Sequence, residues 1–471
     1  MESVGATVVL YPFPGMSHLA QFVEFAKLIH NHHPSLSIII FIIPAPFEIS
    51  STHKYINAVS PTLPFISFHN FPTIPFPPDF YPDIKDRAFG IPELYNPILH
   101  NTLVSISQTS TIKAVFLDFF SNESYQTSVN LNIPTYFFWI TGVSILYQFL
   151  YLITIHNKTI SKKNDVENAY LDIPGVPRIA TSDIDKLMLD QEHSSYKNLI
   201  KVASNMVNCS GIIVNGFVEL ERRAVDAFRD GKCVPADGRI PNVYLVGPLT
   251  ANGNARVLYD PSENECLKWL DMQPIKSVVF LAFGSMGHVF KKDQLKEIAI
   301  GLEKSGQRFL WVVRYDIKEL KSHGEDFNLD DVLPEGFLER IKDRGLVVKN
   351  WAPQPAILSH YSVGGFVSHC GWNSILEAVV AAVPILAWPL YAEQKMNRAY
   401  LVQELKVALA MKMSENGFVI AEEVEQKVKE LLENRVVREK VSEISKTAQV
   451  LVDNGGSSRV DFFKLTRSWE T

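Results

Sequence analysis

The sequence has few cysteines and no long apolar run. Its 471 residues include only four cysteines, none in Cys-x-x-Cys spacing: Cys209, Cys233, Cys266 and Cys370. This composition argues against a disulfide scaffold and a structural zinc site. The longest apolar stretch, 143–155, has about 13 residues, short of the roughly 20 that span a bilayer. The N-terminus also lacks the basic segment of a signal peptide, so we expect a cytoplasmic protein without a membrane span.

An excess of positive charge is missing as well. Lys and Arg together number 45 against 51 Asp and Glu, which gives a formal net charge of −6. A nucleic-acid-binding protein would show a basic excess, so we expect no nucleic-acid partner. Hydrophobic residues at 46% and charged residues at 20% are ordinary for a globular protein and argue against disordered and coiled-coil chains.

Short apolar strand patterns alternate with helical patterns along the chain. Strands are predicted at 6–11, 37–43 and 113–117, and the three- and four-residue spacing of apolar side chains over 18–29 predicts a helix. Few hairpin signals separate these elements. The alternation therefore predicts an α/β fold in which doubly wound parallel sheets carry helices on both faces.

The same alternation begins again after a segment rich in Gly, Asn and Pro. Strands are predicted at 276–283, 309–313 and 363–368, with a helix from Ile375. We predict two Rossmann-like domains facing across a cleft, at residues 1–247 and 261–452, joined by a linker at 248–260. A C-terminal helix within 453–471 is expected to pack back toward the first domain.

The turn after the strand 363–368 has features of an anion site. Gly371 removes side-chain bulk where a ligand could approach the backbone, and His369 adds a donor. Asn373 and Ser374 favour a helix start, where free N–H groups and the helix dipole attract negative charge. A phosphate or diphosphate would suit this turn, but an ordinary capped helix after a buried strand could have the same residues.

Many residue types at fixed offsets mark the 44 residues from Trp351 to Gln394: Trp351-Ala352-Pro353-Gln354, His369-Cys370-Gly371-Trp372-Asn373-Ser374, Glu377, Pro384 and Glu393-Gln394. This segment resembles the signature box of plant UDP-dependent glycosyltransferases. The resemblance extends over the chain through Pro14-Gly15…His18, Val246-Gly247-Pro248-Leu249, Phe283-Gly284-Ser285 and Trp311-Val312-Val313-Arg314. In detail the chain is similar to the branch that glucosylates flavonoids, chalcones and isoflavones. The resemblance implies the two-domain GT-B architecture and a hexosyltransferase.

The resemblance also implies roles for individual residues. Uracil would meet Trp351, Ala352 and Gln354, while Glu377 would hold the ribose hydroxyls. The diphosphate would be held by Ser285, His369, Gly371, Asn373 and Ser374. The sugar would face Thr141, Trp372, Glu393 and Gln394, and the types at 372 and 394 are those associated with UDP-glucose. Each of these residues alone could instead be structural.

The sequence departs from the family pattern at four places. Ala382 replaces a usual glycine, and Glu393 replaces a usual aspartate beside the sugar. Near the N-terminus, Ser17 stands where a glycine is common and Gln21 where a proline is common. The last two changes could alter the loop near the acceptor.

His18 and Asp118 both follow predicted parallel strands. Ligands of open α/β sheets bind beyond the carboxyl ends of the strands, so these side chains can be neighbours although they are far apart in sequence. A carboxylate that holds the imidazole makes histidine an effective general base. The resemblance assigns this role to His18, with Asp118 as its orienting partner. Alone, either residue could be an ordinary helix-start or capping residue.

These assignments imply an inverting displacement in which glucose passes from UDP-glucose to a small phenolic acceptor, giving a β-glucoside. We expect no cofactor and no metal, because positive groups at the helix start would stabilise the leaving diphosphate. Asp183-Ile184-Asp185 has the spacing of a metal-binding Asp pair, but its context has the pattern of a capped helix start. A C-glucoside made by the same base and a non-catalytic nucleotide-sugar binder remain alternatives. A dinucleotide oxidoreductase would need a Gly-x-Gly-x-x-Gly turn after the first strand, which residues 12–17 do not provide.

Aromatic residues flank the predicted active edge of the first domain: Phe13, Phe119, Phe120, Phe138 and Trp139. A pocket lined by such rings would suit a flat phenolic acceptor, although aromatic side chains near a sheet can also be core. We expect the partners of the protein to be this acceptor and the UDP-sugar, and the protein to be a monomer.

Overall fold

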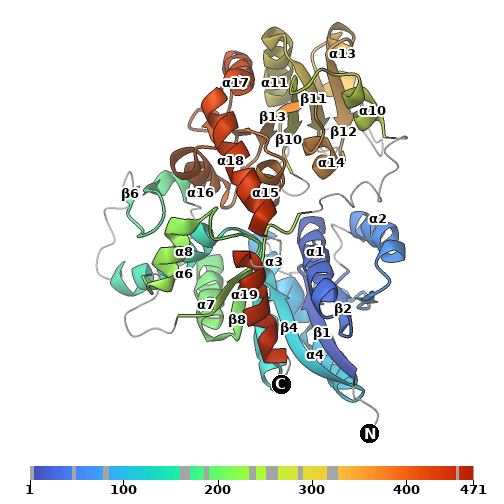
Figure 1. Cartoon of the computed structure of the whole chain (residues 1–471), viewed down its shortest axis with the longest axis vertical. Helices are drawn as coiled ribbons and strands as arrows, with labels where there is room; N and C mark the ends of the chain where they lie inside the picture. The colour runs from blue at the N-terminus through green and yellow to red at the C-terminus, as the bar shows by residue number, and fades with distance from the viewer. Residues whose placement is uncertain are drawn as a thin grey trace. The chain divides into compact units, whose positions relative to one another are not determined.

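A computed structural model of the chain describes residues 5–44, 49–77, 84–159, 170–184, 190–232, 240–250, 264–284, 290–315, 327–451 and 456–469. The chain forms two units. Unit 1 comprises Met1–Leu249 and Leu451–Thr471, and unit 2 comprises Thr250–Val450. Each unit contains a parallel sheet with helices packed around it (Figure 1). Most of the predicted linker, 251–260, lies outside the described residues.

In the described part of unit 1, seven parallel strands form a sheet in the order β3-β2-β1-β4-β5-β8-β9. Their bounds are Gly5–Tyr11 (β1), Ser37–Ile42 (β2), Ile66–Asn70 (β3), Ser110–Asp118 (β4), Thr135–Trp139 (β5), Gly211–Val214 (β8) and Val243–Leu245 (β9). The central strands are almost continuously apolar because helices bury both faces of a parallel sheet. Val9 of β1 lies between Ile39 of β2 and Val115 of β4. The strand order reverses between β1 and β4, where open sheets of this type bind ligands.

Helices cover this sheet and place functional side chains at its carboxyl edge. The first, α1 (Met16–His32), buries Leu19, Phe22 and Ala26 in the same core as strand residues of the sheet. The other helices are α2 (Ile49–Val59), α3 (Ile84–Leu94), α4 (Asn96–Ser107), α5 (Tyr125–Val129), α6 (Val143–Thr159), α7 (Ser194–Asn208) and α8 (Arg222–Arg229). A small antiparallel pair, β6 (Tyr170–Leu171) and β7 (Ile179–Ala180), lies apart from the main sheet.

The end of the chain belongs to unit 1. Helix α19 (Ser457–Thr466), near the C-terminus in Figure 1, packs beside β9. The Leu245 N–H donates to Asp461 Oδ2 at 3.4 Å. Its Phe462 and Leu465, with Trp469 just beyond it, are buried in the core that contains β1 and α1. The C-terminal segment is therefore part of the hydrophobic core of this unit.

Unit 2 repeats the architecture. Its described strands form a six-stranded parallel sheet in the order β12-β11-β10-β13-β14-β15. Their bounds are Val278–Ala282 (β10), Arg308–Val313 (β11), Gly345–Lys349 (β12), Val363–Ser368 (β13), Ile385–Ala387 (β14) and Ala408–Ala410 (β15). The helices are α10 (Glu265–Asp271), α11 (Lys292–Ser305), α12 (Leu329–Val332), α13 (Phe337–Ile341), α14 (Gln354–Leu358), α15 (Trp372–Val380), α16 (Gln394–Ala399), α17 (Ala421–Glu433) and α18 (Arg435–Leu451). The strand order reverses between β10 and β13.

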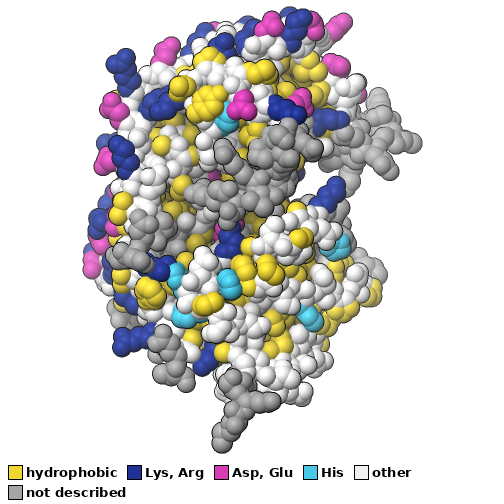
Figure 2. Space-filling view, turned by 45° about the vertical axis from the view of Figure 1, so that its right-hand side comes forward, with side chains coloured by type: hydrophobic (Ala, Val, Ile, Leu, Met, Phe, Trp, Pro, Cys, Tyr) yellow, Lys and Arg dark blue, Asp and Glu magenta, His cyan; other side chains and the backbone are white. Residues whose placement is uncertain are grey.

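The predicted fold class is confirmed: both units are α/β with doubly wound parallel sheets. The predicted strand 363–368 coincides with β13. The start of the following helix was predicted wrongly: the prediction began at Ile375, whereas α15 begins at Trp372 with Gly371 as its N-cap. Within the described residues, the helices are too short or too polar to cross a membrane. On the face drawn in Figure 2, basic and acidic side chains are intermixed.

Candidate functional site

The structure brings His18 and Asp118 into contact at the point where the strand order of unit 1 reverses. His18 lies in the first turn of α1, just beyond β1, and Asp118 ends β4. His18 Nδ1 lies 2.7 Å from Asp118 Oδ2, and both side chains are buried. The other oxygen, Oδ1, accepts a hydrogen bond of 3.0 Å from the Phe120 N–H. A carboxylate at Nδ1 favours the tautomer protonated there, which leaves Nε2 to accept a proton.

Six aromatic side chains surround this pair or extend from it, and we call them the aromatic cluster: Phe13, Phe89, Phe119, Phe120, Trp139 and Phe149. The rings of Phe13 and Phe120 lie 5.3 and 5.8 Å from the His18 ring, centroid to centroid. Phe119 packs edge-on against Trp139 at 5.1 Å. The sequence analysis missed Phe89 of α3 and Phe149 of α6, which contact Phe119 at 5.6 Å each. No local signal marks these two, because only tertiary contacts bring α3 and α6 to this edge.

Phe138 does not belong to the aromatic cluster. It has no exposed surface and packs against Phe22 and Phe25 of α1, at centroid distances of 4.8 and 5.2 Å. Successive side chains of a strand point to opposite faces of the sheet, so Phe138 and Trp139 lie on opposite faces of β5. The structure therefore places Phe138 in the core beneath α1.

Thr141 follows β5 at the same edge of the sheet. It is 8% exposed, and its Oγ1 is buried with no hydrogen-bond partner among the described residues. A buried hydroxyl without a partner is costly. A ligand hydroxyl that reached Thr141 would remove this cost, which fits the predicted sugar contact.

In unit 2, His369 lies at the corresponding reversal of strand order, after β13. A Cβ atom added to Gly284 or Gly371 would lie 2.7 or 2.4 Å from His369 Nε2, so both positions need glycine. Gly284 also has a φ of +84°. Burial, with the positive charge of Arg314, lowers the pKa of His369 to about 4, so the imidazole is neutral near pH 7. Arg314 Nη1 donates to the Gly284 carbonyl at 2.9 Å.

The start of α15 adjoins this histidine. Gly371 is the N-cap residue and has no side chain with which to cap the first turn, which contains Trp372, Asn373 and Ser374. The N–H groups at a helix start and the positive end of the helix dipole attract anions. Together with His369, this turn has the geometry expected of a diphosphate site.

The predicted nucleoside residues gather around the start of α14. Gln354 Nε2 donates to Ser374 Oγ at 2.9 Å and to Glu377 Oε2 at 2.7 Å, so the structure joins these three side chains. Ala352 is buried, whereas the Trp351 side chain is 48% exposed. A large exposed apolar ring, three residues before the amide that bonds Glu377, fits a nucleoside, whose base stacks and whose ribose offers hydroxyl donors.

The predicted sugar residues of unit 2 lie on α15 and α16. Trp372 and Gln394 are buried, and Glu393 is the N-cap residue of α16. Gln394 Oε1 accepts hydrogen bonds from the Leu390 and Tyr391 N–H groups at 2.9 and 3.0 Å, so this side chain also orders the preceding loop. Ser285, the remaining predicted diphosphate residue, lies outside the described residues.

The residues considered for metal binding are only partly described. Asp183 ends a short 3-10 turn (Thr181–Asp183), and Asp185 lies outside the described residues. Among the residues that the structure describes, no group of three or more His, Cys, Asp or Glu side chains could hold a metal ion.

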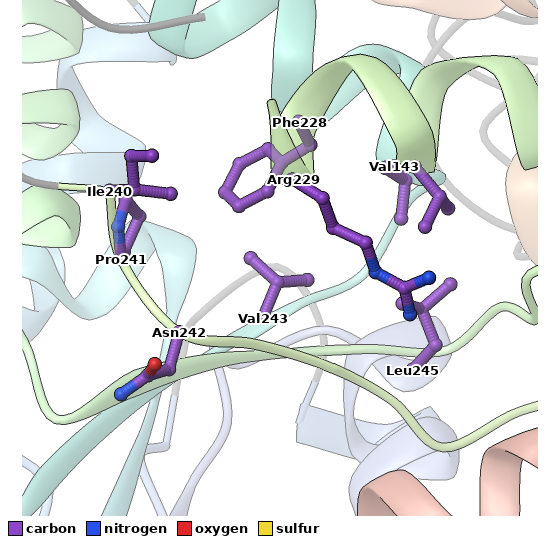
Figure 3. Close-up of a pocket in the computed structure, with 9 residues that line it drawn as sticks. Val143, Phe228, Arg229, Ile240, Pro241, Asn242, Val243 and Leu245 are labelled. Carbon is purple, nitrogen blue, oxygen red and sulfur yellow. The ribbon is translucent and has the colours of Figure 1, made fainter. Parts of the chain in front are cut away.

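A cavity of about 250 Å³ lies elsewhere in unit 1 (Figure 3). Phe228 and Arg229 of α8, Val243 and Leu245 of β9, and Val143 of α6 are among the residues that line it. None of the predicted site residues lines this cavity. The chemistry of the site is therefore not located there.

Comparisons with known proteins identify the family. Residues 238–449 match the family model described as UDP-glucoronosyl and UDP-glucosyl transferase. UDP-glycosyltransferase 88B1 of Stevia rebaudiana is 60% identical, over 100% of this chain and 99% of the relative. Anthocyanidin 5,3-O-glucosyltransferase of a Rosa hybrid cultivar is 44% identical, over 99% of each chain. The structure of Phytolacca americana UGT2 complexed with UDP-2fluoro-glucose and pterostilbene is similar with a TM-score of 0.84 and 34% identity, over 99% of this chain and 100% of that one. The chain thus belongs to the plant UDP-glycosyltransferases and is a glycosyltransferase enzyme.

Proposed function

We propose that this enzyme transfers glucose from UDP-glucose to a hydroxyl of a small phenolic acceptor, with inversion at the anomeric carbon. His18 Nε2 takes the acceptor proton, and the resulting oxygen attacks C1 of the glucose as the bond to UDP breaks. The product is a β-glucoside, and UDP leaves. The observation that carries this proposal is the buried His18–Asp118 pair, 2.7 Å apart, next to the aromatic cluster.

The donor would be held by unit 2. In this proposal Trp351 stacks on uracil, Ala352 and Gln354 meet its edge, and Glu377 binds the ribose hydroxyls. The diphosphate lies at the start of α15 with His369, Gly371, Asn373, Ser374 and Ser285. Positive ends of N–H dipoles stabilise the charge that develops on the leaving UDP, so the displacement requires no divalent cation. Thr141, Trp372, Glu393 and Gln394 bind the glucose.

The acceptor class follows from two supports. The aromatic cluster offers flat apolar surfaces beside the base, which suit a phenolic ring. The Rosa relative is named for an anthocyanidin, and the Phytolacca structure contains pterostilbene. We therefore propose a flavonoid, chalcone or isoflavone hydroxyl as the acceptor.

Purified protein should be incubated with UDP-glucose and a panel of flavonoids, chalcones and isoflavones, with and without EDTA. We expect hexose addition by mass spectrometry, a β anomeric proton by NMR, and no effect of EDTA. A product that resists acid hydrolysis would identify C-glucosylation instead. The proposal fails if no phenolic is glucosylated, or if an α-glucoside forms.

The role of His18 is tested by His18→Ala. We expect the transfer rate to fall by about 10² to 10⁴, the contribution of a general base, while the dissociation constant of UDP changes little. Parallel loss of activity and UDP affinity would contradict the assignment, because His18 lies in the other unit from the UDP site proposed here.

A further inference from the structure

Two buried amide side chains, Gln21 and Asn215, connect three segments at the active edge of unit 1. Gln21 lies one turn after His18 on α1, and Asn215 follows β8. Gln21 is 4% exposed and Asn215 is fully buried. The two residues are 194 positions apart in the sequence, and the Asn215 Nδ2 donates to Gln21 Oε1 at 3.3 Å.

Backbone groups fix the orientation of both amides. Gln21 Nε2 donates to the Ile140 carbonyl at 3.1 Å, the residue before Thr141. Asn215 Nδ2 donates to the Leu249 carbonyl at 3.0 Å, and Asn215 Oδ1 accepts from the Leu249 N–H at 2.7 Å. Turning either amide would place oxygen against oxygen or N–H against N–H. The hydrogen bonds from the Leu249 N–H through Asn215 and Gln21 to the Ile140 carbonyl therefore share one donor direction, and Asn215 also donates back to the Leu249 carbonyl.

The strand order explains why this connection matters. His18 follows β1, Thr141 follows β5 and Asn215 follows β8, so the amides span the part of the sheet from β1 to β8. Leu249 is the last residue of unit 1 before the chain enters unit 2. Within this network, Gln21 provides a direct side-chain link between the helix of the base and the loop of Thr141. A residue without a side-chain donor, such as proline, could not make this link.

We propose that Gln21, held by Asn215, is a positioning residue for glucosyl transfer: it sets the distance between the base His18 and the hydroxyl of Thr141. This inference rests on the proposed function for the roles of those two residues. Neither amide needs to touch substrate. Small misplacements of reacting groups cost large factors in rate, so an otherwise inert buried hydrogen bond can control turnover.

The test variant is Gln21→Met, which keeps the length of the side chain and removes its amide. We expect kcat to fall about ten-fold or more, with an unchanged dissociation constant for UDP. Gln21→Asn keeps an amide but is one methylene shorter, and it should show the same loss. The matched control is Thr135→Val, which removes buried hydrogen bonds to Ser128 and Ile133 at the opposite end of β5. It should leave kcat unchanged even if it lowers stability.

Two further measurements separate positioning from general destabilisation. In Gln21→Met, amide hydrogen exchange over 137–143 should accelerate, whereas Thr135→Val should not affect that segment. In a double-mutant cycle, the losses in kcat caused by Gln21→Met and Thr141→Ala should combine to less than their product. The reason is that both substitutions act through the hydroxyl of Thr141. Unchanged exchange, multiplicative losses, or an equal fall of kcat in Thr135→Val would each overturn the inference. If the wild-type protein glucosylates no phenolic, the proposed function fails, and the exchange comparison alone decides whether Gln21 holds the loop.

Discussion

Trp351 leaves about half of its side chain exposed, whereas tryptophan is usually well buried. The ring follows β12 and precedes Gln354, whose amide joins Ser374 and Glu377. An exposed indole is a flat apolar surface on which a planar base could stack. The exposure is therefore explained if uracil completes the packing.

Trp351→Ala should weaken UDP binding. Stacking of a base on an aromatic ring is worth about 1–3 kcal/mol, so the dissociation constant should rise by about 5- to 160-fold, as measured by isothermal titration calorimetry. Tyr361→Ala is the control, because Tyr361 is equally exposed on unit 2 but bonds Asp271 away from this site. An equal effect in both variants would count against stacking at Trp351.

The buried His369 makes stability depend on pH. Its pKa falls to about 4 in the folded protein through burial, with a contribution from Arg314, against about 6.5 when unfolded. Between these values the unfolded chain binds more protons. The free energy of unfolding is therefore at its full value above pH 6.5 and falls as the pH drops toward 4. The loss is on the order of 3 kcal/mol. The unfolding free energy of unit 2 should be measured from pH 6.5 to pH 4 in the wild type and in His369→Gln. We expect the variant to lose less stability than the wild type as the pH falls. If the unfolding free energy changes equally with pH in both proteins, the prediction is wrong.

At the scale of elements, α6 begins on a buried carboxylate from another part of the chain. Glu221, just before α8, accepts hydrogen bonds from the Val143 N–H at 2.9 Å and the Ser144 N–H at 2.8 Å. Burial raises the pKa of Glu221, while the two backbone donors act in the opposite direction. This contact fixes the start of α6 directly after Thr141.

Glu221→Ala should leave two buried N–H groups without their acceptor. At about 1–3 kcal/mol for each, the free energy of unfolding of unit 1 should fall by about 2–6 kcal/mol. Chemical denaturation followed by a unit 1 probe measures the change. Glu219→Ala, which removes a carboxylate that is 27% exposed and lies two residues earlier, should cost far less. If the two variants behave alike, the cap is not important for α6.

Element positions were predictable where periodicity is strong. The strand predicted at 363–368 and the helix predicted over 18–29 match β13 and α1, because long apolar patterns depend on local geometry. The start of α15 was missed because Asn373 and Ser374 favour caps but lie in its first turn, behind Gly371. Glycine occupies the N-cap position because a side chain at residue 371 would collide with His369.

At the scale of the whole chain, the last helix completes the core of the first unit. Phe462, Leu465 and Trp469 are buried there, although the intervening 201 residues, from Thr250 to Val450, form unit 2. A chain that ends at residue 455 should therefore lose several buried side chains, each worth about 1.5–3 kcal/mol. Differential scanning calorimetry should show a strongly lowered transition for unit 1, while UDP binding by unit 2 persists. Unchanged melting would show that α19 adds nothing to this core.

The sequence by itself determined what depends on neighbouring residues: the alternation of strand and helix, the glycine turn at His369, and the dense run of residue types from Trp351 to Gln394. Only the tertiary structure decided which distant residues meet. It joined His18 to Asp118 and Gln21 to Asn215, brought Phe89 and Phe149 to the aromatic cluster, and withdrew Phe138 into the core. The reason is physical. Periodicity is set within a few residues, whereas strand order and the face to which a side chain points depend on the packing of the whole sheet.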